Sequence, residues 1–293
     1  MEHNQMIQEG RTAMRIENKT ELMERMKKVL ESIEEDERYQ KSCRVLKYYL
    51  SGYEKRELNE LREWVSDDLH DVDGAYPMHP DVAALIVDIY RDRVDDEDAD
   101  AMCNLGALYY TGRAGKQDYE KAVFYYDMAD KAGNRMATEN MGYIYYYGRT
   151  GEKDYEKAFQ YFVKAALGGS TRSLYKVGDF YRNGYYVEKD PREAFRIYQE
   201  CTERMEEYED LEIAPDVYMR MGDCLYDGTG VEKDLIGALR FMGLAETLFY
   251  SRLKEGDFYQ KANLEHVLKV EEEIRKKIQN EELPDLSWAH YNE

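Results

Sequence analysis

The sequence is poor in the residues that mark several common protein classes. Its 293 residues include 5 prolines, 4 cysteines and 2 tryptophans. So few prolines favour helices over a sandwich of short strands, because proline-bearing turns are typical of the latter. The cysteines share no regular spacing and form no Cys-x-x-Cys pair. We therefore expect reduced thiols in a cytoplasmic protein rather than a disulfide framework.

Long hydrophobic runs are also absent. No stretch approaches the roughly 18 apolar residues that a membrane-spanning helix requires. The opening segment, MEHNQMIQEGRTAMRIENKT, has no apolar core of the kind found in secretion signals. These observations predict a protein that neither crosses nor inserts into a membrane.

Positive charge is in short supply. Lys and Arg total 41 against 61 Asp and Glu, which gives a net charge of −20. Such a field repels nucleic acid and anionic membranes, and no basic stripe offsets it. A basic peptide or protein would be attracted. Apolar and aromatic residues reach 43%, so a packed core is expected, and the 28 tyrosines suit half-buried surfaces.

What the sequence does contain is a repeat. A glycine after a bulky apolar residue recurs at steps of 36, 36 and 44 residues. Four further columns keep register with it: a tyrosine in three of the four units, a second glycine, an aspartate and an alanine. The columns are Gly106, Gly142, Gly178 and Gly222; Tyr109, Tyr145, Tyr181 and Leu225; Gly112, Gly148, Gly184 and Gly228; Asp118, Asp154, Asp190 and Asp234; Ala122, Ala158, Ala194 and Ala238.

Each unit reads as two helices. In the first unit, Gly112 supplies the positive φ that ends the first helix, and Asp118 caps the N-terminus of the second. Ala122 lies one turn before the large Tyr126, so a small and a large residue share a helical face and allow close helix packing. A unit of this size cannot bury its apolar face alone, so neighbouring units must stack.

The pattern Ala-x-x-x-Φ-Gly-x-x-Tyr-x-x-Gly, followed by Asp-x-x-x-Ala, resembles the Sel1-like repeat (SLR) family of the tetratricopeptide superfamily. The resemblance covers about Asp100 to Phe249. The fourth unit departs from it at Leu225 and Gly237, and the third is eight residues longer. The resemblance implies an all-α, right-handed superhelical solenoid. It also implies a non-enzymatic adaptor or scaffold that binds a protein or peptide partner without a cofactor.

The flanking segments fit helical caps, which a solenoid needs to cover its exposed ends. We expect a disordered N-terminus and an unassigned tail around these caps. The predicted organisation is 1–18 disordered, 20–98 an N-terminal helical cap, repeats at about 99–134, 135–170, 171–214 and 215–249, a capping helix at 250–280, and a tail at 281–293.

Motifs for catalysis or metal binding find little support. The turn at Gly115-Lys116 lacks the first glycine and the Ser or Thr of a phosphate-binding loop. The segment DDLHDVDGAYPMHP lacks the terminal acids of a calcium loop around Gly74. It leaves a His/Asp metal site as a minor alternative to a polar loop. We predict no catalytic residue, no metal and no cofactor.

Candidate binding residues follow from a helical wheel. If tetratricopeptide geometry holds, the first helix of each unit lines the concave face, and the positions opposite the packing side are rich in tyrosine. The predicted partner-binding residues are Cys103, Tyr110, Glu139, Tyr143, Tyr146, Tyr147, Tyr175, Asp179, Arg182, Met219, Asp223 and Tyr226.

Three alternatives to this groove stay open. The tyrosines can instead be solvated or packed against one another. The tyrosine-rich face can pair with a second copy, which would make the chain a weakly associating homo-oligomer. A ligand sensor or an enzyme, with its site between the N-terminal cap and the repeats, would need a deep pocket with convergent polar groups.

Overall fold

The computed structural model describes residues 15–72, 78–208 and 211–280. In these ranges all regular structure is helical and no strand occurs, which confirms the predicted all-α class. The chain divides into two compact units, Met1–Tyr161 and Phe162–Glu293. The division falls inside helix α9 (Tyr155–Leu167), so each unit is described by itself.

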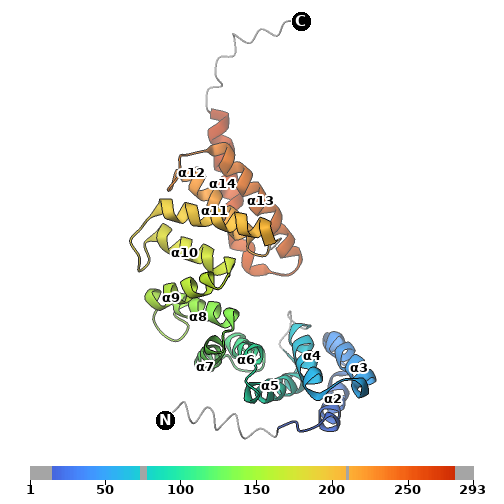
Figure 1. Cartoon of the computed structure of the whole chain (residues 1–293). Helices are drawn as coiled ribbons and strands as arrows, with labels where there is room; N and C mark the ends of the chain where they lie inside the picture. Colours follow the sequence, from blue (N-terminus) through green and yellow to red (C-terminus); the bar gives the residue numbers. More distant parts are fainter. Residues whose placement is uncertain (1–14, 73–77, 209–210, 281–293) are drawn as a thin grey trace. The chain divides into compact units, whose positions relative to one another are not determined.

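Unit 1 contains the N-terminal helices and the first repeats (Figure 1). One hydrophobic core joins α2 to α7, with Leu46, Ile86 and Leu105 among its buried residues. The helices preceding the repeats therefore share their interior with the first repeat. The elements are α2 (Lys19–Ile33), η1 (Glu37–Tyr39), α3 (Gln40–Gly52), η2 (Tyr53–Lys55), α4 (Leu58–Asp71), α5 (Pro80–Asp95), α6 (Ala99–Thr111), α7 (Tyr119–Lys131), α8 (Arg135–Tyr147) and the first half of α9.

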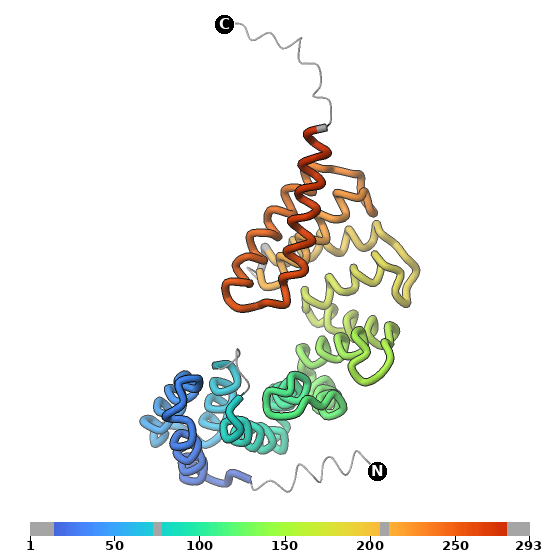
Figure 2. The backbone as a smooth tube through the Cα atoms, turned by 180° about the vertical axis from the view of Figure 1, so that it is seen from behind, coloured from blue at the N-terminus to red at the C-terminus, as the bar shows by residue number. Residues whose placement is uncertain are grey.

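Unit 2 contains the remaining repeats and a long C-terminal helix. Figure 2 shows α13 and α14 as two long adjacent helices, and Val267 and Ile274 of α14 are fully buried in their shared core. The elements are the end of α9, α10 (Thr171–Asn183), α11 (Pro191–Tyr208), α12 (Ala214–Asp227), α13 (Leu235–Lys254), η3 (Phe258–Gln260) and α14 (Lys261–Asn280).

The predicted helix boundaries have the expected backbone causes. Gly112 ends α6 with φ 71°, and Gly148 ends α8 with φ 64°, in the left-handed region that favours glycine. Asp118 accepts a hydrogen bond from the backbone N–H of Lys121 in the first turn of α7. The two other glycines of this column behave in the same way at α10 and α12.

The glycine that heads the repeat has a packing role. A Cβ on Gly106 would lie 2.7 Å from a ring carbon of Tyr126, and one on Gly178 would lie 2.6 Å from Tyr198. The first helix of a repeat therefore leaves a hole that the large residue of the second helix fills. This contact explains why the glycine column and the large-residue column occur together.

The described residues begin earlier than the predicted cap. Residues 1–14 and 281–293 lie outside the described residues, so the expectations for both tails concern mostly those segments. Within 15–18, however, Ile16 is fully buried and Asn18 caps α2 through its side chain. A single apolar residue in a polar segment gave no periodicity from which this contact could be predicted.

Candidate functional site

In unit 2, two of the predicted binding residues belong to a buried ion network. Arg220 of α12 donates to both oxygens of Asp179, at 2.5 and 2.8 Å. The Tyr198 hydroxyl donates to the same carboxylate at 2.8 Å, and Lys176 Nζ lies 3.5 Å away. The Arg220 guanidinium also lies over the Tyr175 ring, 4.7 Å from its centroid. Asp179 and Tyr175 are thus buried and contact their own unit.

The charges of this network shape its titration. Burial raises the pKa of the Asp179 carboxyl, but the charges of Arg220 and Lys176 outweigh burial, so the pKa lies below its ordinary value. Burial lowers the pKa of Lys176, and its attraction to Asp179 does not fully compensate. The Asp179–Arg220 pair is therefore satisfied, whereas the ammonium of Lys176 is destabilised by its surroundings.

Asp223 connects α10, α12 and α14. Its carboxylate accepts a hydrogen bond from Arg182 at 3.3 Å and lies 2.8 Å from Nε2 of His266. The hydrogen bond to Asp223 raises the pKa of His266, although partial burial opposes the shift. Arg182 and Asp223, which were both predicted to face a partner, are thus paired with each other within unit 2.

Two more predicted residues in the fourth repeat contact the C-terminal helix. The Tyr226 hydroxyl donates to Glu273 at 2.8 Å and accepts from Lys277 at 2.6 Å. Met219 is buried in the core that α14 completes. Helix α14 therefore lies against the side of α12 that the helical wheel assigned to a binding groove.

In unit 1 the predicted positions are at least partly exposed, except for Cys103. Cys103 is 2% exposed and packs beside Ala122 and Tyr126, and burial raises its pKa to about 12. It is a core residue. Tyr110, Glu139, Tyr143 and the neighbouring tyrosines of α8 are only partly buried or exposed. These are the positions around which a surface can be built.

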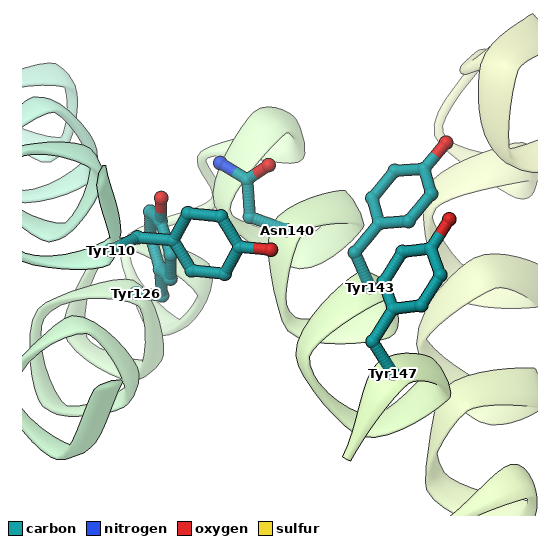
Figure 3. A pocket seen from close by; sticks show the side chains of 5 residues that line it. All are labelled: Tyr110, Tyr126, Asn140, Tyr143 and Tyr147. Carbon is teal, nitrogen blue, oxygen red and sulfur yellow. The ribbon is translucent and has the colours of Figure 1, made fainter. Parts of the chain in front are cut away.

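Four tyrosines and an asparagine line a cavity of about 190 Å³ in unit 1. Figure 3 shows Tyr110 of α6 in front of Tyr126 of α7, with Asn140, Tyr143 and Tyr147 presented by α8. The rings of Tyr143 and Tyr147 are nearly parallel, with centroids 6.1 Å apart. Sites for drug-sized ligands measure about 300–1,000 Å³. This cavity is smaller than that range, and its volume suits a single side chain.

The neighbouring tyrosines continue this aromatic surface. The ring of Tyr146 meets those of Tyr147 and Tyr155 edge-on, at centroid distances of 5.1 and 5.7 Å. Glu139 lies half-buried on the same helix. The structure thus brings three predicted residues, Tyr110, Tyr143 and Tyr147, to one cavity, with Tyr146 beside it.

Sequence reasoning missed the arginine at this surface. Arg149 follows the glycine that ends α8, and its guanidinium lies over three rings: Tyr147 at 5.1 Å, Tyr119 at 5.8 Å and Tyr110 at 6.0 Å. A hydrogen bond with Tyr110 raises the pKa of Arg149 further. Arg149 lies in a turn, whereas the wheel considered only helical positions. The signal was an arginine directly after the C-cap glycine in two repeats, Arg113 and Arg149.

The segment considered for metal binding has structural roles where it is described. His70 is mostly buried, with Nδ1 3.0 Å from the Tyr90 hydroxyl, and His79 accepts from the backbone of Asp81 at the start of α5. Asp73 and Gly74 lie outside the described residues. Elsewhere in the described ranges, no three His, Cys, Asp or Glu side chains are grouped as metal ligands would be.

No helix in the described part of the chain has both the length and the apolar character required to cross a bilayer.

The Sel1 repeat family model matches residues 99–134, 135–170, 171–200 and 215–247. No curated protein matches the chain.

Two solved structures are similar to this chain. A Sel1 repeat protein from Oxalobacter formigenes superposes with a TM-score of 0.53 at 22% identity, covering 69% of this chain and 78% of that one. The protein c5321, a protective antigen of uropathogenic Escherichia coli strains with an SLR fold, gives a TM-score of 0.55 at 21% identity. It covers 80% of this chain, which in turn spans 48% of c5321. Both likenesses are evidence of fold, a helical solenoid.

Proposed function

Because the chain belongs to the Sel1-like repeat family, whose members are generally non-enzymatic scaffolds for protein interactions, we propose that it is an adaptor that binds a segment of a partner protein. The binding surface lies on α6 and α8 of unit 1. The observation that carries the proposal is the cavity between Tyr110 and Tyr143, which is of a size to take one side chain.

The residue types at this surface support binding. Tyrosine offers a large ring with few rotatable bonds, together with a hydroxyl that can form a hydrogen bond, and it is enriched at the energetic centres of interfaces. Asn140 adds a polar group to the cavity. An anchor side chain that enters the cavity would thus be met by ring faces and at least one amide.

The contacts in unit 2 narrow the site. The predicted residues Asp179 and Asp223 are paired within their own unit, and Tyr226 and Met219 contact α14. Their contacts support a role in stability. Proposed partner-binding residues are therefore Tyr110, Glu139, Tyr143, Tyr146 and Tyr147.

The charge of the chain supports a basic partner, since a net charge of −20 accelerates encounter with positively charged molecules. Four buried free cysteines are in keeping with a role in the cytoplasm. Weak self-association through the tyrosine-rich face is the competing use of the same surface. Analytical ultracentrifugation of the wild type and Tyr143→Ala distinguishes partner binding from self-association, because only self-association gives a dimer that the substitution weakens.

The test is a selection of short peptides from a random display library with the full chain, followed by titration of the selected peptides. Tyr110→Ala and Tyr143→Ala should each weaken binding by at least about tenfold, as expected for an anchor position. The control is Tyr259→Ala, because Tyr259 is 95% exposed in η3 of unit 2. Thermal unfolding of each variant verifies its fold. Selected peptides that bind the two cavity variants as tightly as the wild type would refute the proposal.

A further inference from the structure

We infer that the tyrosine cavity recognises a guanidinium group, so that the partner segment presents an arginine that competes with Arg149 for the rings of Tyr110 and Tyr147. The inference rests on the proposed function and names the chemistry of its ligand. Three observations support it: tyrosine rings surround Arg149, no carboxylate pairs with it, and two of its neighbouring rings also line the cavity.

The first observation is the cage of rings. The Arg149 guanidinium lies within 6.0 Å of the ring centroids of Tyr110, Tyr119 and Tyr147. Tyr110 and Tyr119 meet edge-to-face at 5.3 Å, so the cage is itself packed. Aromatic faces carry negative electrostatic potential and attract cations, and the flat, weakly hydrated guanidinium stacks on them well.

The second observation is the absence of a carboxylate. The chain has 61 acidic residues, yet none in the described ranges forms an ion pair with the Arg149 guanidinium. Its electrostatic partners are the three tyrosines of the cage. Arg149 is also exposed to solvent. A cation that is held by partly exposed tyrosine rings and one tyrosine hydroxyl can be replaced by another cation without leaving a buried carboxylate unpaired.

The third observation links the cage to the cavity. Tyr110 and Tyr147 belong to both, so the guanidinium of Arg149 lies over two of the rings that also line the cavity. A second arginine in the N-terminal helices provides a contrast. Arg56 also lies over aromatic rings and, like Arg149, forms a hydrogen bond with a tyrosine hydroxyl, but its rings do not line the cavity. Arg56 completes a packed cluster, whereas Arg149 borders a vacant one.

Charge complementarity selects the cation over the anion. A carboxylate or phosphate would face the negative side of the rings within a chain of net charge −20. Lysine concentrates its charge on a strongly hydrated ammonium and cannot stack as a plane. An arginine in an extended segment of a partner protein therefore fits this site best.

The experiment uses a peptide selected as above and its versions in which arginine is replaced by citrulline, which keeps the shape but lacks the charge, or by lysine. Citrulline should weaken binding at least about tenfold, and lysine less. Arg149→Ala removes the internal competitor and should tighten binding about 3- to 30-fold. The control is Arg240→Ala, an exposed arginine of α13, which should leave affinity unchanged.

The sign of the Arg149→Ala effect is decisive. Weaker binding would mean that Arg149 contacts an acidic ligand, and unchanged binding would mean that it does not compete for the rings of the cavity; either result overturns the inference. Peptides that depend on Tyr143 but carry no arginine overturn this inference and leave the proposed function intact. A dimer that Tyr143→Ala abolishes would assign the cavity to a second copy of the chain, and the absence of any Tyr143-dependent peptide would overturn both proposals.

Discussion

Replacing Asp179 with asparagine should lower the free energy of unfolding more than almost any other substitution that changes a single polar atom. Asp179 is 6% exposed, and its carboxylate neutralises Arg220 through two hydrogen bonds. The amide keeps the shape but leaves the Arg220 guanidinium and the Lys176 ammonium without a countercharge at this position. Removing one partner of a buried ion pair costs about 3–5 kcal/mol, and we expect a loss of that size for Asp179→Asn.

Lys176→Met should behave in the opposite way, although Lys176 belongs to the same network. Burial lowers the pKa of Lys176, so its charged form is less stable in the folded protein than in water. A methionine removes that charge and leaves the Asp179–Arg220 pair intact. We expect the free energy of unfolding at pH 7 to stay the same or to rise.

Urea unfolding followed by circular dichroism measures both variants, with Glu193→Gln as the control. Glu193 forms an exposed pair with Arg196, so its loss should change stability by no more than about 0.5 kcal/mol. The reasoning fails if Asp179→Asn loses less than about 1 kcal/mol. It fails equally if Lys176→Met loses as much as Asp179→Asn.

Two further predictions concern packing and pH. Gly106→Ala should destabilise the fold by about 1–3 kcal/mol, because the added Cβ would meet the Tyr126 ring. Gly243→Ala should instead stabilise the fold by up to about 1 kcal/mol, because its Cβ would lie 3.6 Å from the nearest atom. Thermal unfolding of both variants tests the contrast. His266 has a raised pKa, so its contribution is complete below about pH 6.5 and is lost as pH rises through the folded value. The urea midpoint should therefore fall between pH 6 and 9 in the wild type more than in His266→Asn; equal slopes would contradict this.

The repeat was predictable because its signals act locally. Gly112 has to adopt a positive φ, and Asp118 has to cap the next helix, wherever the rest of the chain lies. Such requirements appear in the sequence at fixed spacing. The helical wheel likewise selected Tyr110 and Tyr143, two of the residues that line the cavity.

The rest of the site depends on partners far away in sequence. Asp179 pairs with a residue 41 positions later, and Asp223 with one 43 positions later. A helical wheel gives the direction of a side chain on its own helix, but not which charged residue of a neighbouring helix lies opposite it. The same limitation applies to Cys103, whose burial is decided by α7 and α8.

The ion pairs of unit 2 also restrict how the array can change in length. Arg220 ties α12 to α10, and His266 ties α14 to α12, so these three helices recognise one another in a fixed order. A whole repeat inserted between any two of them would separate matched charges and, for the Asp179–Arg220 pair, leave them buried and unpaired. Duplications or engineered extensions placed outside this block avoid that penalty.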